Sequence, residues 1–215
     1  AFVTLGSKLD IKQFAGLNKK CLFNQNIPFD LSVKKSRFEL NEHSDKGEIP
    51  QTVIGQGNTL MTPFHNALLM CAVANDGVLM KPYVIDHIEG ADNTTVKENI
   101  PEIYADLMSK KDAKKLQKML REVVTDGTGY SLDTDLYTAA GKTGTAENEG
   151  KYAHAWFVGY SNVEDPDLVV CVIVENTGAG SKYAVPIAKK IFNSYYNNNM
   201  KEYYGEKKNT AQSDE

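Results

Sequence analysis

Five consecutive residues, Gly141-Lys142-Thr143-Gly144-Thr145, carry the side chains of this sequence that are best suited to chemistry. A glycine followed by lysine and threonine can bind phosphate, because backbone N–H groups and the ammonium surround the phosphate oxygens. That motif also needs a glycine five residues before Gly141, where the sequence has Leu136. It further needs a helix directly afterwards, whereas the residues after Thr145 continue a strand-like pattern. The sequence therefore argues against nucleotide binding here.

The second chemistry open to these residues is acyl transfer on a strand at the edge of a sheet. A glycine in such a strand lets a substrate backbone come close, and Lys142 and Thr143 would then face an acyl-enzyme pocket. A match of three residues can arise by chance, so the assignment depends on the strands that follow. The next strand-like segment is His154-Ala-Trp-Phe-Val-Gly-Tyr160, and Leu168-Val-Val170 comes after it.

This succession resembles the end of the transpeptidase domain of penicillin-binding proteins. Three upstream segments resemble the part of those proteins between the second and third active-site motifs, namely Ile54-Gly-Gln-Gly57, Thr62-Pro63-Phe64 and Ala74-Asn-Asp-Gly77. The resemblance covers roughly residues 1 to 196 and suits the monofunctional, class B-like members best. It implies an α+β fold of the β-lactamase and transpeptidase type, with an antiparallel sheet flanked by helices.

The two other motifs of this family do not stand in their expected context. The family's nucleophile lies in a Ser-x-x-Lys helix, and Ser32-Val-Lys-Lys35 fits that spacing, but the segment is irregular and has no helical apolar face. We interpret it as a coincidence. No serine has an asparagine two residues later, so the Ser-x-Asn motif is absent too. Because Ala1-Phe-Val-Thr-Leu-Gly6 resembles the residues directly after that motif, we expect a domain that is incomplete on its N-terminal side.

The resemblance implies a role for each residue of the candidate site. In the family a serine attacks a D-Ala-D-Ala stem peptide, and β-lactams mimic that peptide. Lys142 would hold the substrate carboxylate and support proton transfer, and the hydroxyls of Thr143 and Thr145 would bind the same carboxylate. The N–H of Thr145 would be one oxyanion donor, and Gly144 would leave room for the acyl chain. Glu147 is a candidate at the pocket rim, with an exposed strand-end glutamate as the alternative.

The same resemblance implies partners and a location. Expected partners are D-Ala-D-Ala stem peptides, β-lactam antibiotics, the N-terminal part of the domain and a glycosyltransferase of the wall-synthesis complex. The site would face the outside of a bacterial cell membrane, anchored by a segment not in this sequence. Two alternatives stay open, a β-lactam sensor of a signalling receptor and a non-catalytic scaffold. The upstream coding sequence would distinguish them.

Composition and the spacing of glycine, cysteine and histidine residues argue against several other functions. A net charge of -4 and a pI near 5.6 argue against nucleic-acid binding, which depends on clustered Lys and Arg. Gly55-Gln-Gly57 lacks the third glycine of a dinucleotide motif, so no cofactor is predicted. Cys21, Cys71 and Cys171 form no close pair, which favours buried thiols. His154 has no nearby His or Cys, so we expect it to hydrogen-bond at a strand start rather than to bind metal.

Periodicity and capping signals predict the elements that position the site. Helices are expected at 10–21, from Thr62 to Gly77, at 109–125 and from Pro186, with strands at 137–147, 153–161 and 168–175. Residues 24–52 are expected to be a surface excursion, residues 1–199 one domain part and residues 200–215 an exposed tail. Trp156 and Phe157 are expected in the core. The predicted core-facing helix residues are Phe64, Ala67, Leu68, Cys71 and Ala74; Leu116, Met119, Leu120 and Val123; Ile187, Ile191 and Phe192.

Overall fold

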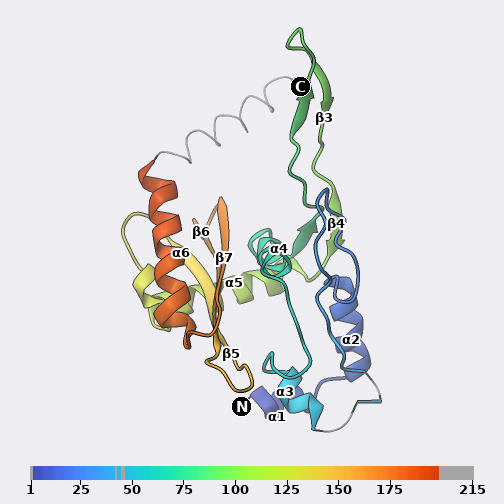
Figure 1. The fold of residues 1–215 in the computed structure, drawn as a ribbon, viewed down its shortest axis with the longest axis vertical. Coiled ribbons are helices and arrows are strands. Elements are labelled where there is room, and N and C mark those ends of the chain that lie inside the picture. The colour runs from blue at the N-terminus through green and yellow to red at the C-terminus, as the bar shows by residue number, and fades with distance from the viewer. Residues whose placement is uncertain (1, 42, 45–46, 199–215) are drawn as a thin grey trace. The chain divides into compact units, whose positions relative to one another are not determined.

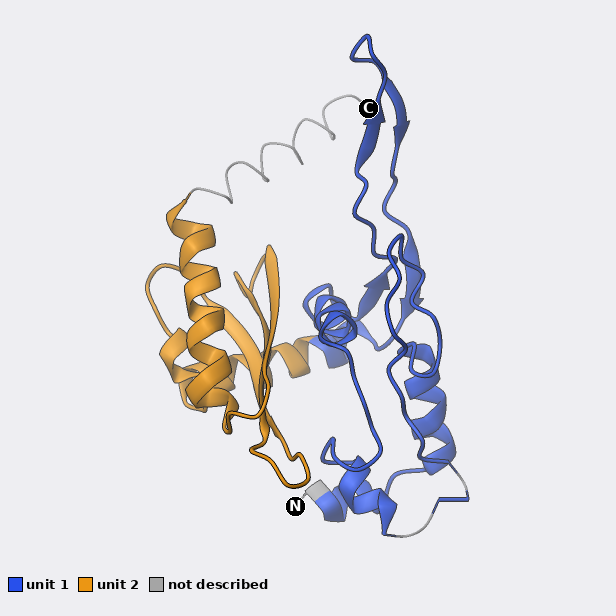
Figure 2. Ribbon diagram, in the orientation of Figure 1, with its two compact units in different colours: residues 1–113 blue, residues 114–215 orange. Residues whose placement is uncertain are grey.

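The computed structural model describes residues 2–41, 43–44 and 47–198, which fall into two compact units, 1–113 and 114–215 (Figure 2). The predicted tail lies outside the described residues. The elements, labelled in Figure 1, are α1 (Phe2–Gly6), α2 (Ile11–Lys20), α3 (Glu48–Thr52), α4 (Pro63–Ala74), β1 (Val78–Met80), β2 (His87–Glu89), β3 (Thr95–Glu98), β4 (Ile103–Asp106), α5 (Lys110–Thr125), a 3-10 turn (Tyr130–Leu132), β5 (Ala139–Ala146), β6 (His154–Ser161), β7 (Leu168–Val174) and α6 (Gly180–Asn197).

Two helices of the first unit begin at the caps that the sequence predicted. The carboxylate of Asp10 accepts a hydrogen bond from the N–H of Gln13 at 3.1 Å, and the side-chain amide of Gln13 donates back at 3.3 Å. The hydroxyl of Thr62 likewise accepts the N–H of His65 at 3.1 Å, with Pro63 at the first helical position. These caps satisfy N–H groups that have no partner within the helix. They are local interactions, which is why sequence alone could predict them.

Helix α4 is a core helix, but its buried face differs from the prediction. Its buried residues are His65, Leu68, Met70, Ala72 and Ala74. Cys71 is exposed and Cys21 and Cys171 are half-buried, so the prediction of buried thiols is wrong for Cys71. The interpretation of residues 24–52 as a surface excursion is also wrong in part. Phe38 and Leu40 of that segment are buried with Phe23, because a chain without regular elements still supplies apolar side chains to the core.

Two short antiparallel ribbons follow α4 in the first unit. β1 pairs with β4, and β2 pairs with β3. The turn before β1 depends on Gly77, which has φ +95° and whose added Cβ would lie 2.5 Å from the carbonyl oxygen of Met108. Only glycine fits both conditions, so Gly77 ends the helix as predicted. All residues of β2 and β3 are exposed.

The second unit is built on the predicted three-stranded antiparallel meander, with strand order β5-β6-β7. Helix α6 packs along one face of this sheet (Figure 1). The core on that face contains Phe157 of β6, Val172 of β7, Phe192 of α6 and Val124 at the end of α5. Phe157 is fully buried, as expected, whereas Trp156 is half-buried. The α+β prediction is confirmed for this unit.

The buried stripes of α5 and α6 are rotated relative to the predicted ones. On α5 the buried residues are Ala113, Gln117, Leu120 and Val124, while Met119 is 60% exposed. On α6 Phe192 is fully buried as predicted, but Ile187 and Ile191 are 40% and 41% exposed. Ala184, Val185 and Ala188 face the sheet instead.

Helix α6 also begins at Gly180 rather than at Pro186, which lies inside it on the exposed side. Proline is a start signal because it fits the first turn of a helix. Packing on the sheet stabilises the preceding turn and keeps the proline within the helix.

Candidate active site

The site strand β5 is an edge strand, because its only strand partner among the described residues is β6. An edge strand leaves every other N–H and C=O group without a strand partner. An extended peptide can therefore add to β5 as a further strand, with main-chain hydrogen bonds giving affinity. The prediction that Lys142-Thr143-Gly144 lies on such a strand is confirmed.

Lys142 and Thr143 project to opposite faces of the sheet but meet at its edge. The register pairs Lys142 with Val158 and Thr143 with Phe157, and neighbouring residues of a strand point to opposite faces. Phe157 belongs to the core covered by α6, so Thr143 lies on the helix-covered face and Lys142 on the other. The exposed Lys142 Nζ donates to the carbonyl oxygen of Thr143 at 2.6 Å. This bond places the ammonium charge close to the backbone of Thr143.

The hydroxyl of Thr143 has a partner that the sequence did not reveal. Its Oγ1 lies 2.6 Å from the Oγ1 of Thr128, in the segment just after α5. An added Cβ at Gly127 would lie 2.7 Å from the carbonyl oxygen of Val123, and the N–H of Gly129 donates to that same oxygen at 2.9 Å. The two glycines thus fix the backbone on either side of Thr128. The sequence indicates only a helix end here, because nothing local relates Thr128 to a strand residue 15 positions later.

The backbone of the site strand is tightly packed at Gly144. A Cβ at Gly144 would lie 3.1 Å from the Cβ of Trp156, its partner on β6. On the other face, a Cβ at Gly180 would lie 2.5 Å from the Gly144 carbonyl oxygen and closer still to that of Trp156. The first turn of α6 therefore packs directly on the backbone of the site strand. Glycine at both positions permits this close approach.

Thr145 and Glu147 lie where β5 leaves the sheet. Thr145 is an exposed residue of the strand, and Glu147 is exposed one residue beyond its end. The following turn is tied to the turn between β7 and α6 by Asn148, whose side-chain amide donates to Asn176 Oδ1 at 2.9 Å. The N–H of Asn176 donates to His154 Nδ1 at 3.1 Å, which confirms the predicted hydrogen-bonding role of His154 at a strand start.

Ser32, the literal match to Ser-x-x-Lys, is exposed in a segment without helix between α2 and α3. A nucleophile of this family would stand on a helix with an apolar face, so the structure agrees with a coincidental match. Within the described part of the chain, no group of three or more His, Cys, Asp and Glu residues is arranged to hold a metal ion.

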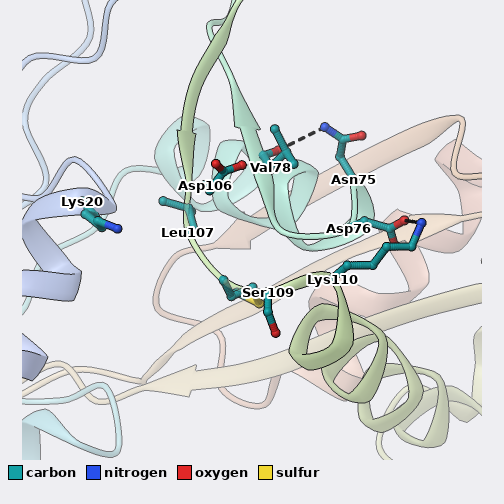
Figure 3. Close-up of a pocket in the computed structure, with 9 residues that line it drawn as sticks. Lys20, Asn75, Asp76, Val78, Asp106, Leu107, Ser109 and Lys110 are labelled. Atoms are coloured by element: carbon teal, nitrogen blue, oxygen red, sulfur yellow. Dashed lines mark hydrogen bonds and ion pairs between the residues drawn. The ribbon is translucent and has the colours of Figure 1, made fainter.

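A separate pocket of the first unit lies beside Asn75-Asp76-Gly77 (Figure 3). Its charged lining includes Lys110 and Asp76, which form an ion pair at 2.9 Å. The Asn75 side chain donates to the carbonyl oxygen of Val78 at 3.1 Å and so closes the turn after α4. These contacts account for the local structure of the pocket, and none of the predicted site residues lines it.

An α+β unit with a Lys-Thr-Gly edge strand buttressed by a C-terminal helix has the architecture of penicillin-recognising transpeptidases. The chain belongs to the family described as "Penicillin binding protein transpeptidase domain", whose model matches residues 1–193. The class B-like resemblance is thereby confirmed, since the curated relatives are class B penicillin-binding proteins.

Two curated relatives and one solved structure illustrate the similarity. Stage V sporulation protein D of Bacillus subtilis is 32% identical over 203 residues, covering 88% of this chain and 31% of that protein. Peptidoglycan D,D-transpeptidase MrdA of Haemophilus influenzae is 34% identical over 176 residues, covering 72% of this chain and 27% of that protein. The imipenem acyl-enzyme of penicillin-binding protein A from M. tuberculosis matches with a TM-score of 0.81 and 26% identity, covering 90% of this chain and 44% of that chain. This chain thus spans about a third or less of the curated relatives' length.

Proposed function

We propose that this chain is the C-terminal part of a peptidoglycan D,D-transpeptidase domain, and that β5 binds the end of a stem peptide. The observation that carries the proposal is the Lys142-Thr143-Gly144 edge strand, with an exposed ammonium and hydroxyls at an edge that pairs with no further strand among the described residues. A stem peptide that ends in D-Ala-D-Ala offers what this edge can bind, an extended backbone and a terminal carboxylate. Membership of the transpeptidase family supports the same assignment.

The chemistry proposed is acyl transfer through a serine supplied from outside this chain. The serine oxygen attacks the carbonyl between the two D-Ala residues, the C–N bond breaks, and the terminal D-Ala leaves with a proton on its nitrogen. An amine of a second stem then takes the acyl group and frees the serine. Lys142 holds the carboxylate and supports the proton transfers, while Thr143 and Thr145 donate hydrogen bonds to that carboxylate. Glu147 lies at the rim.

The N–H of Thr145 is proposed as one of the two donors to the oxyanion that forms during each attack. Loss of one such donor typically slows acyl transfer about 10²- to 10³-fold. The second donor in this mechanism is the N–H of the nucleophile itself. A chain without that residue would have an incomplete oxyanion site, so we propose that this chain alone is inactive.

β-Lactams are proposed to bind at the same strand, with their carboxylate on Lys142 and Thr143. A structural neighbour supports this, because it was solved as an imipenem acyl-enzyme.

The proposed location is the outer face of a bacterial cell membrane, in complex with a glycosyltransferase. Within the described residues, no helix has the length and apolar character of a membrane span.

The test uses the full-length protein that contains this chain, incubated with a fluorescent penicillin and then with stem peptides. A stoichiometric label that resists boiling, together with formation of cross-linked product, is expected. A label without cross-linking would favour a β-lactam sensor. No label on a folded full-length protein would favour a non-catalytic scaffold and overturn the proposal.

A further inference from the structure

A second threonine, Thr128, completes the environment of the proposed carboxylate-binding hydroxyl. Thr128 and Thr143 place their hydroxyl oxygens 2.6 Å apart, a typical O–H···O distance. Thr128 lies outside the site strand and is not one of the predicted site residues. It is exposed, while Thr143 is half-buried, so the pair lies at the margin of the covered face. The inference below rests on the proposed function, because it concerns the ligand of Thr143.

The number of protons available fixes the direction of this hydrogen bond once a carboxylate is bound. A threonine hydroxyl carries one proton and two acceptor lone pairs, and an ionised carboxylate can only accept. If Thr143 donates its single proton to the carboxylate, it has none left for Thr128. The contact at 2.6 Å is then a hydrogen bond only if Thr128 donates to Thr143. A bound carboxylate therefore selects one direction of hydrogen-bond donation, in which Thr128 donates to Thr143 and Thr143 donates to the ligand.

The backbone around Thr128 is built to keep this geometry. The carbonyl oxygen of Val123 accepts from Gly129 and leaves no space for a side chain at Gly127. The loop beyond the helix end is therefore held against α5, with Thr128 between its two fixed neighbours. A hydroxyl held in place by its backbone costs less conformational entropy on ligand binding than one on a free loop.

We propose that Thr128 is a positioning residue for carboxylate recognition, which donates to Thr143 and turns the Thr143 hydroxyl toward the carboxylate of a stem peptide or a β-lactam. A donor to Thr143 polarises its O–H bond and strengthens the bond to the anion. Without Thr128, the Thr143 proton is free to point elsewhere. One hydrogen bond of this kind corresponds to about a 3- to 10-fold change in acylation rate.

The test measures acylation of the full-length protein by benzylpenicillin and by its methyl ester, which lacks the negative charge. Thr128→Val keeps the shape and removes the hydroxyl, and Thr128→Ser restores the hydroxyl. The Val variant is expected to lower the preference for the free acid over the ester by about 3- to 10-fold, with recovery in the Ser variant. The matched control is Thr125→Val on the same helix end, because the Thr125 hydroxyl donates to the carbonyl oxygen of Arg121 at 3.3 Å and not to Thr143.

Several outcomes separate the possibilities. If Thr128→Val slows the acid and the ester equally, or if Ser does not restore the preference, Thr128 acts only on structure and the inference is wrong. A preference unchanged in both Thr128→Val and Thr128→Ala also overturns it, while leaving the proposed function intact. Failure of the wild-type protein to acylate would overturn both proposals. If the effects of Thr128→Val and Thr143→Val on the acylation rate do not add in the double variant, the result supports coupling of the two hydroxyls through their hydrogen bond.

Discussion

Replacement of Lys142 is the most direct test of the proposed site. Lys142 is exposed, and its described contact is the bond from Nζ to the carbonyl of the adjacent Thr143, so Lys142→Ala should change stability by under about 0.5 kcal/mol. Loss of the Lys142 charge should have a larger effect on acylation than on stability. An ammonium about 4 Å from a carboxylate contributes up to about 4 kcal/mol near a protein surface, and solvent at this exposed strand reduces that value. A remaining effect of about 2.7 kcal/mol corresponds to a 10²-fold slower acylation.

The assay compares the penicillin acylation rate with the melting temperature of the full-length protein. Lys142→Arg should recover only part of the rate, because arginine keeps the charge but cannot release a proton near neutral pH. Lys118→Ala, which removes an exposed lysine from α5, controls for the general loss of positive charge. Acylation of Lys142→Ala at the wild-type rate would mean that Lys142 is an ordinary edge-strand lysine. A slower acylation that is accompanied by a proportionate drop in melting temperature would also refute the reasoning, because the loss would then come from stability.

Three further predictions concern the chain itself. The isolated chain should not be labelled by fluorescent penicillin at pH 7, and a boiling-resistant label would return attention to Ser32. β7 has β6 as its only strand partner among the described residues, so the isolated chain should associate with increasing concentration and dissociate when the upstream segment is supplied, as measured by sedimentation. His65 is fully buried, and burial lowers its pKa. Its stabilising effect should be complete above about pH 6.5 and decline as the pH falls, so thermal melts of wild type and His65→Gln between pH 7 and pH 5 should show a steeper loss in wild type.

The pH prediction depends on the hydrogen bonds of the histidine. Its Nε2 donates to the carbonyl oxygen of Cys21 at 2.5 Å, and its Nδ1 is buried without a hydrogen-bond partner. Protonation at Nδ1 would place a charge and an unpaired donor in the core, which the folded state disfavours more than the unfolded state. Equal pH dependence in wild type and His65→Gln would count against this account.

The sequence by itself determined the features that depend on neighbouring residues. The caps at Asp10 and Thr62 form within one turn, and Lys142-Thr143-Gly144 lies on the strand that its local pattern predicted. The family resemblance rested on the same short segments. These features could be predicted because their energies come from contacts between residues close in the chain.

Only the tertiary structure decided which side of each helix is buried and what surrounds the site. Met119 and Ile191 are apolar and correctly spaced, yet they are exposed, because the fold covers the adjacent side of each helix, which carries Gln117 on α5 and Ala188 on α6. Thr128 reaches Thr143 only because the core fixes the end of α5 beside β5. Contacts of this kind join residues distant in sequence, and packing of the whole unit, rather than local propensity, sets their geometry.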